Sequence, residues 1–327
     1  MNQSNKKPPT NKKERRKRGL IQKAIDKLII AILSLFVSSL PYTPLPILRF
    51  LSVIVFIVLY PTVATVTGMR RRFIKNITMT YMEEINQREA RRIARRSIYN
   101  LLIGIFELGY YYHHKNRKKL LKNLTVEGHE NLLKARQGGK GAVGVGAHLG
   151  NFQLMVIRLD REEINSMFLF KEPKPQNLAY VIRKYMDIMG LKRIYITNRE
   201  ETAKETIEEL NTSGFVVLIA DEFKRRGVEV NFFDQPTLMA AGPADFALKT
   251  GTMIVPIFSI RGKKSRYRII IDEPIEYSPT GDTENDIKAL TQMRTDILEK
   301  YVRKYPDQWL WIHSRWKKKY IRHENNS

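Results

Sequence analysis

The sequence has 327 residues, contains no cysteine, and carries 57 Lys and Arg against 33 Asp and Glu, which gives a formal charge of +24. The absence of cysteine excludes disulfides, a thiolate nucleophile and a cysteine-ligated metal. The excess of positive charge indicates an anionic partner, and charge alone favours nucleic acid and an anionic membrane about equally.

The N-terminal region distinguishes between these two partners. Residues 1–27 include a strongly basic stretch without apolar periodicity, and we expect this tail to be disordered. Residues 28–69 hold two uncharged apolar runs, 28–48 and 50–69, with basic residues on both flanks. Basic flanks mark the cytoplasmic side of a membrane and attract anionic headgroups, whereas a nucleic-acid binder has no need of apolar runs. The pattern therefore predicts a membrane anchor and no nucleic-acid partner.

Prolines limit the form that this anchor takes. Three prolines between residues 41 and 46 end a first helix near Leu40, and Pro61 breaks the second run. Each unbroken run is shorter than the roughly 20 residues that a spanning helix needs. We expect either a tight helical pair that dips into one leaflet, or one short anchor helix followed by a packed one. A hairpin buried in the protein core is the alternative.

The remainder of the chain, residues 70–320, reads as one α/β domain. A helix is predicted over 84–112, and a second basic helical stretch ends around Lys122. Strand-like runs and helices then alternate, which predicts a mostly parallel central sheet flanked by helices, preceded by the membrane-associated helical segment. The strand-like runs are 141–146, 167–170, 193–196, 215–220, 253–260 and 267–272, and the helical stretches are 150–158, 175–189, 200–211, 243–250 and 284–305.

A histidine stands where chemistry is expected in such a fold. His148 follows the run GAVGVG and precedes a predicted helix, at the carboxyl end of a strand where a parallel sheet opens into a crevice. The helix that begins near Gly150 directs backbone N–H groups and its positive end into the same space, which favours a developing oxyanion. A lone histidine at a strand end is also common as a purely structural residue.

The residues around His148 resemble a known family. The run HLGNFQ at 148–153 is similar to the HxGNWE block of the bacterial lipid A biosynthesis acyltransferases, the late lauroyl and myristoyl transferases of the lysophospholipid-acyltransferase-like superfamily. The resemblance extends from about Arg49 to Lys319. Further blocks in family order are FLFKEP, LIADEF, VNFFDQPTLMAAGPADFALKTG, IVPIF and QWLWIHSRWK.

This resemblance implies an O-acyltransferase at the cytoplasmic face of the bacterial inner membrane. It implies acyl carrier protein as donor, a hydroxyl of a lipid A precursor as acceptor, and no cofactor. The histidine of the family's H-x4-D/E motif serves as general base, and its acidic residue orients it. Here that acidic position is Gln153. Three alternatives follow: Asp221 and Glu222, after the strand FVVLIA, supply the charge instead; the site tolerates Gln153; or the chain is a degenerate, non-catalytic member.

Other site residues are predicted with the same resemblance in view. Gly150 and Asn151 are expected to bind substrate beside His148, and Lys171 and Arg183 to bind a phosphate of the donor arm or of the acceptor lipid. Without a cysteine or a G-x-S-x-G elbow, direct transfer in a ternary complex is expected rather than an acyl-enzyme. The other histidines show no metal-ligand spacing, so no metal is predicted. Another glycolipid, an aminolipid or a lysophospholipid is the alternative acceptor.

Overall fold

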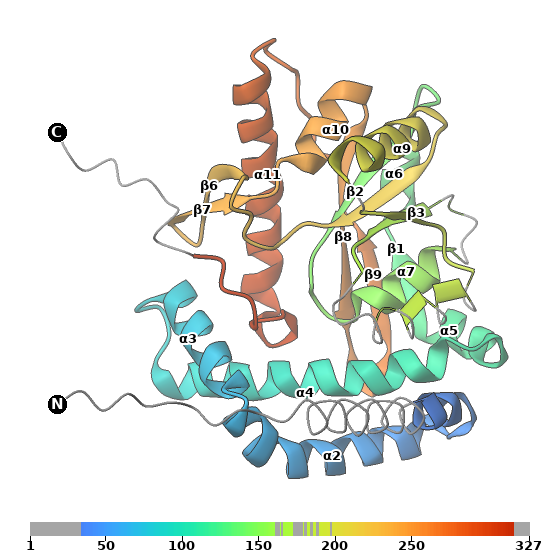
Figure 1. The fold of residues 1–327 in the computed structure, drawn as a ribbon, viewed down its shortest axis with the longest axis vertical. Helices are drawn as coiled ribbons and strands as arrows, with labels where there is room; N and C mark the ends of the chain where they lie inside the picture. Colours follow the sequence, from blue (N-terminus) through green and yellow to red (C-terminus); the bar gives the residue numbers. More distant parts are fainter. Residues whose placement is uncertain are drawn as a thin grey trace, which may run out of the picture.

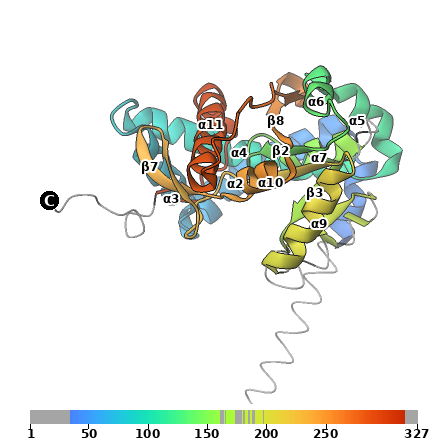
Figure 2. The same ribbon diagram turned by 90° about the horizontal axis from the view of Figure 1, so that it is seen from above.

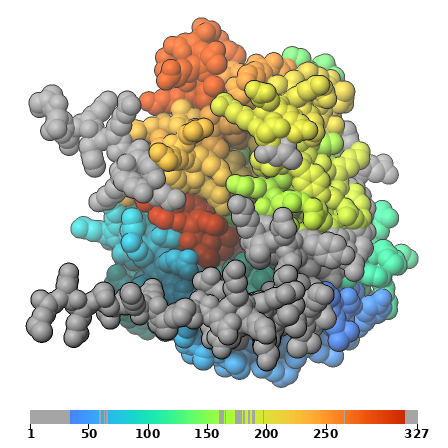
Figure 3. Space-filling model, in the orientation of Figure 1, coloured from blue at the N-terminus to red at the C-terminus, as the bar shows by residue number. Residues whose placement is uncertain are grey.

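The computed structural model describes residues 34–160, 164, 166–172, 179, 182–183, 186–187, 190–196 and 198–316. The predicted tail 1–27 lies outside these residues, and so does most of the helix predicted over 175–189. Figure 1 shows a central sheet with the long helix α11 (Thr283–Lys304) upright beside it and α4 (Gln87–Tyr111) running across its lower end. Seen from above, α5 (Arg117–Asn123) lies at one end of the molecule and α11 lies toward the other (Figure 2). The space-filling view shows the helices near the N-terminus, coloured blue, along the lower edge (Figure 3).

The central sheet has seven strands in the order β1-β9-β8-β2-β5-β3-β4. Every neighbouring pair whose register is defined runs parallel except β8 and β9, so the prediction of a mostly parallel sheet is confirmed. All five residues of β2 are buried, as expected for a strand with covered faces. The strands are β1 (Leu124–Glu127), β2 (Ala142–Gly146), β3 (Ser166–Phe170), β4 (Arg193–Tyr195), β5 (Phe215–Ile219), β8 (Met253–Arg261) and β9 (Tyr267–Ile271).

Helices surround this sheet, and most of them lie where the apolar periodicity predicted them. The helices that follow strands are α6 (His129–Ala135), α7 (Phe152–Asp160), α9 (Arg199–Asn211) and α10 (Gly242–Thr250). Side-chain caps define several starts: Asn198 accepts a hydrogen bond from the Glu201 N–H, and Asp282 accepts from the N–H groups of Glu284 and Asn285. The observed bounds differ from the predicted ones by one to three residues.

The second apolar run forms one continuous helix, α2 (Leu45–Val66), that passes through Pro61. The prediction that Pro61 breaks this run is therefore wrong. Proline removes one backbone hydrogen bond from a helix, and packing on both sides of the residue outweighs that loss. Phe56 and Ala64, on either side of Pro61, are both buried, and α2 packs on α3 (Met69–Tyr81) and α4.

The two sides of α2 differ in what covers them. Leu48, Ser52 and Phe56 recur every four residues and are buried against the neighbouring helices. The opposite side is apolar but exposed, with Phe50 at 66% and Ile57 at 63%. The stretch 45–62 is long and apolar enough to cross a membrane, and 18% of it is buried in the described structure. A core hairpin would bury most of its length, so that alternative is wrong for α2.

Two strand features and one short helix were not predicted from the sequence. The strand features are the edge strand β1 and the hairpin of β6 (Val228–Phe232) and β7 (Gln235–Met239), and the short helix is α6; the hairpin packs against α11 (Figure 1). The hairpin turns through Phe233 and Asp234, both at positive φ of 52° and 54°. Two such residues form the tight turn that usually selects Asn-Gly or Asp-Gly, and a phenylalanine there hides the signal.

Candidate active site

The sheet itself brings two site residues together. β2 and β5 are parallel neighbours, and Gly146 is in register with Ile219 at their carboxyl ends. The chain then continues to His148 from β2 and to Asp221 from β5, so both residues leave the same edge of the sheet. A predicted histidine and a predicted acidic residue 73 positions apart therefore meet in space.

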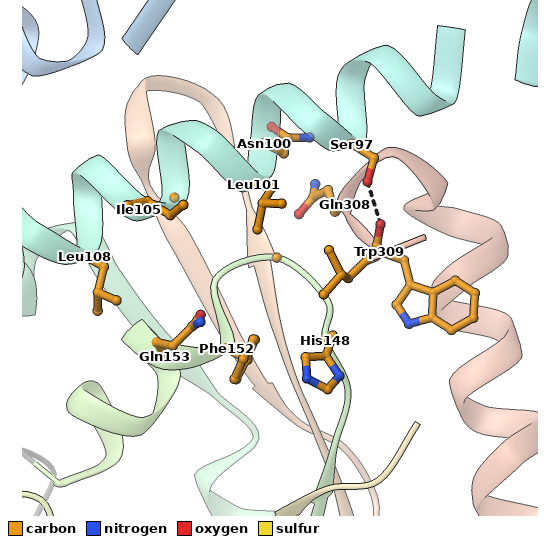
Figure 4. A pocket seen from close by; sticks show the side chains of 13 residues that line it. Ser97, Asn100, Leu101, Ile105, Leu108, His148, Phe152, Gln153, Gln308 and Trp309 are labelled. Carbon is orange, nitrogen blue, oxygen red and sulfur yellow. Dashed lines mark hydrogen bonds between the residues drawn. The ribbon is translucent and has the colours of Figure 1, made fainter. Parts of the chain in front are cut away.

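The imidazole of His148 is paired with the carboxylate of Asp221. The Nδ1 atom of His148 lies 2.7 Å from Oδ1 of Asp221, whose side chain is fully buried. Because an ionised carboxylate only accepts hydrogen bonds, Nδ1 carries the proton and Nε2 keeps the lone pair. The His148 side chain is 19% exposed and lines a pocket (Figure 4). The hydrogen bond from Nδ1 to Asp221 therefore fixes the tautomer of His148 and leaves Nε2 unprotonated, as a base requires.

Asp221 remains charged because several groups compensate its burial. The Trp309 indole N–H and an Arg315 guanidinium N–H each donate to Oδ2 at 2.8 Å, and a second Arg315 N–H donates to the Asp221 carbonyl at 2.9 Å. Burial alone would raise the pKa of Asp221, but the charges of His148 and Arg315 and these hydrogen bonds hold it well below its ordinary range. For His148, burial lowers the pKa, and the Asp221 charge and hydrogen bond outweigh burial, so the net pKa is raised.

The C-terminal segment holds the His148 loop in place. Leu149 and Trp309 form an antiparallel bridge, the Leu310 N–H donates to the His148 carbonyl at 3.0 Å, and the Gly150 N–H donates to the Gln308 carbonyl at 2.9 Å. The three tryptophans of this segment, at 309, 311 and 316, are all buried, so they form core rather than an interfacial belt. Residues 308–316 of the block QWLWIHSRWK thus support the loop that carries His148.

Gly150 and Asn151 have structural roles in this loop. Gly150 has φ +59°, and a Cβ atom there would lie 1.9 Å from the Ser259 carbonyl oxygen, so only glycine fits. Its N–H donates to the Gln308 carbonyl, and a contact of Gly150 with the substrate stays a prediction. Asn151 is buried; its amide donates to the Gly104 carbonyl and accepts from the Leu154 N–H. These bonds give Asn151 a capping role at the start of α7, and its contact with the substrate stays a prediction.

Gln153 does not contact the imidazole nitrogen that the family's acidic residue was expected to orient. Nδ1 of His148 is bonded to Asp221, and the His148 ring packs against Phe152 with 4.9 Å between ring centroids. Figure 4 shows Gln153 on the far side of Phe152, and Gln153 is exposed at the pocket rim. Of the three alternatives left open by the sequence, the geometry matches the one in which Asp221 supplies the charge.

The pocket in front of His148 lies between α4 and α7. It has a volume of about 50 Å³, and apolar side chains from α4 form one wall: Leu101, Ile105 and Leu108. Ser97 and Asn100, one turn earlier on the same helix, add polar groups. Ser97 donates to the Trp309 carbonyl at 2.6 Å, as drawn in Figure 4, so α4 is tied to the C-terminal segment at the pocket.

Glu222 lies near the pair but belongs to a second, more exposed cluster. Its carboxylate lies 3.4 Å from Nε2 of His313 and 3.3 Å from the Lys224 ammonium. The His313 ring centroid is 6.0 Å from that of His148. Burial raises the pKa of Glu222, but the charges of His313 and Lys224 outweigh this and lower it. No sequence pattern singles out His313, because it lies far from His148 along the chain.

The two predicted phosphate-binding residues lie outside the pocket that His148 lines. Lys171 and Arg183 are both exposed, and Arg183 pairs with Glu172 at 3.0 Å. Most of the chain between them, 173–178 and 180–181, is outside the described residues, so their role in binding stays a prediction. Within the described residues, no group of three or more His, Asp or Glu side chains is arranged to hold a metal ion.

The fold and the site together define an α/β protein in which a buried carboxylate orients a histidine at the open edge of a parallel sheet. The chain belongs to the bacterial lipid A biosynthesis acyltransferase family, whose model matches residues 12–318. It is similar to the phosphatidylinositol mannoside acyltransferase of Mycobacterium tuberculosis, with 27% identity over 206 residues, covering 62% of this chain and 63% of the relative. The enzyme of the same name from Mycolicibacterium smegmatis is 26% identical over 201 residues, covering 61% and 64%. The match thus spans less than two thirds of these relatives' length.

Proposed function

We propose that the protein transfers a fatty acyl group from a thioester donor to a hydroxyl of a glycolipid, with His148 as general base. The observation that carries the proposal is the 2.7 Å contact between His148 and the buried Asp221. A fixed imidazole beside an apolar pocket suits deprotonation of a lipid hydroxyl, and membership of the acyltransferase family supports the reaction class.

The proposed transfer is direct. Nε2 of His148 removes the proton of the acceptor hydroxyl as that oxygen attacks the thioester carbonyl. The N–H groups of Phe152 and Gln153, in the first turn of α7, have no acceptor within the helix and stabilise the oxyanion in place of the Gly150 N–H. Collapse of the tetrahedral intermediate breaks the C–S bond, and the thiolate takes the proton from His148. Asp221 stabilises the imidazolium between the two steps.

A phosphorylated glycolipid is the acceptor that we propose. The family is described by lipid A biosynthesis and the relatives by phosphatidylinositol mannoside, and both are glycolipids that carry sugar hydroxyls. Between the alternatives of glycolipid, aminolipid and lysophospholipid, this agreement favours the first. A lipid A precursor remains our specific expectation within that class. The exposed apolar side of α2 supports a location on the cytoplasmic face of the inner membrane.

Acyl carrier protein is the proposed donor, because a cationic hollow adjoins the site. A hollow of about 650 Å³ begins at Ala220, next to Asp221, and has an apolar floor that includes Phe246. Its rim carries four cationic side chains: Arg199, Lys224, Arg225 and Arg226. Such a rim complements an acidic carrier protein and the phosphodiester of its prosthetic arm.

The proposal is tested by transfer of a labelled acyl group from acyl carrier protein to purified glycolipid acceptors, followed by mass spectrometry. His148→Ala and the near-isosteric His148→Gln should both abolish product while circular dichroism stays unchanged. Retained transfer in either folded variant would exclude His148 as the base. In cells, loss of the gene should remove one acyl chain from one glycolipid, and only the chain with His148 intact should restore it.

A further inference from the structure

A cationic groove lies between α2, α3 and α4, away from the His148 pocket. It consists of two adjoining hollows of about 520 and 600 Å³, and Arg70 and Arg91 line both. Figure 1 shows the three helices together at the lower end of the molecule. The other cationic residues that line the hollows are Arg71, Lys75, Arg88, Arg92 and Arg95.

These charges have little compensation within the described part of the chain. Arg92 pairs with Glu89 at 2.6 Å, but among the described residues no carboxylate lies within salt-bridge distance of Arg70, Arg91 or Arg95. Arg70 instead lies over the Tyr60 ring, 5.8 Å from its centroid. Like charges gathered around a hollow repel one another, so an anion that enters it is favoured.

The groove also has an apolar wall, which a free anion would not use. Phe56, Ile57 and Tyr60 of α2 line one hollow, and Ile74 and Met79 of α3 line the other. Ile57 is 63% exposed and belongs at the same time to the outer apolar side of α2. The apolar surface and the cations are therefore continuous, as they are where a protein meets both the acyl chains and the headgroups of a bilayer.

We propose that this groove binds the headgroup phosphate of an anionic phospholipid, with Arg70 and Arg91 as its principal ligands and the lipid's acyl chains along the exposed side of α2. The site is separate from the reaction at His148 and does not depend on the proposed function. Guanidinium groups suit this role because they donate two parallel hydrogen bonds to phosphate oxygens.

The test compares two pairs of substitutions that change the charge equally on the same two helices. Arg70→Gln with Arg91→Gln removes the groove ligands, and Arg72→Gln with Arg96→Gln removes exposed arginines outside both hollows. Binding of the full chain to phosphatidylcholine vesicles that contain about 30% phosphatidylglycerol is measured by flotation. At about 1 kcal/mol for each contact, the groove pair should weaken binding roughly 30-fold and the control pair less than about threefold.

Three outcomes would overturn the proposal. Equal weakening by both pairs would show diffuse attraction instead of a site. Equal affinity for inorganic phosphate and for monomeric short-chain phosphatidylglycerol, measured by calorimetry, would show a free-anion site, because the apolar wall would then contribute nothing. Unchanged vesicle binding with lost binding of acyl carrier protein would assign the groove to the donor. His148→Ala should leave vesicle binding intact, so these results are independent of the catalytic proposal.

Discussion

Replacing Asp221 by Asn tests the central pair most directly. The substitution removes the carboxylate that accepts from His148, Trp309 and Arg315. An amide can donate as well as accept, so His148 can adopt the tautomer whose Nε2 is protonated and cannot act as a base. The same carboxylate-to-amide change in serine proteases costs about 10⁴ in rate. We expect kcat to fall by about 10³ to 10⁴, with KM for the acceptor changed less than about threefold, because buried Asp221 does not touch substrate.

The same substitution should lower stability, and the assay has to separate the two effects. Arg315 is 1% exposed and would lose its charged partner, which costs about 3–5 kcal/mol in the free energy of unfolding. Urea unfolding measures this cost, and initial rates are taken where the variant is fully folded. Glu222→Gln is the matched control: its carboxylate is in the exposed cluster with Lys224, and its rate should fall less than tenfold. A folded Asp221→Asn variant with more than a tenth of the wild-type rate would refute the reasoning.

Three further predictions follow from the site. A general base must be neutral, and the pKa of His148 is raised, so the transfer rate should increase with pH through a value above the ordinary 6.5. Asp221→Asn should move this increase to lower pH. A move to higher pH would contradict Asp221 as the cause of the raised pKa. Gln153→Glu should change kcat less than about threefold in the transfer assay, because Nδ1 of His148 already has a carboxylate partner; a large gain would mean that Gln153 limits the reaction. Gly150→Ala should lower the free energy of unfolding, measured with urea, by about 2–4 kcal/mol. Gly68→Ala is the control, because Gly68 also has a positive φ but no described atom lies within 4 Å of a Cβ there, and it should cost about 1 kcal/mol. Equal costs would show that small shifts relieve the contact with Ser259.

Local patterns were sufficient to predict six of the seven strands of the central sheet and the position of His148. Each of the six predicted strands is a short apolar run bounded by turns. Burial on both faces explains why the runs that form β2, β5 and β8 lack alternation. The place of His148 followed from one strand and one helix start. Asp221 was only one of several candidates for the partner of His148, because the sequence does not show that β2 and β5 are neighbours. It is this adjacency that brings Asp221 and His148 together.

The remaining errors come from tertiary contacts that local patterns do not contain. Pro61 stays inside α2 because α3 and α4 hold the helix on both sides. Arg315 and Trp309 reach Asp221 across 94 and 88 residues, respectively, so the C-terminal block that resembles the family did not indicate which residue it contacts. The bond from the Asn151 amide to the Gly104 carbonyl, 47 residues away, is likewise a tertiary contact that no local pattern predicts.

Helix α4 connects the proposed membrane site with the proposed chemistry. Arg91 lines the cationic groove and Gly104 lines the His148 pocket, and thirteen residues of helix separate them by about 20 Å at 1.5 Å per residue. The helix is fixed at its far end, because buried Glu107 accepts hydrogen bonds from Arg261 and Tyr267 of the β8–β9 hairpin. The headgroup of one phospholipid cannot reach across this distance. A phospholipid whose phosphate lies at Arg91 therefore cannot also present a hydroxyl to His148, and under our proposal the acceptor enters the pocket as a separate molecule.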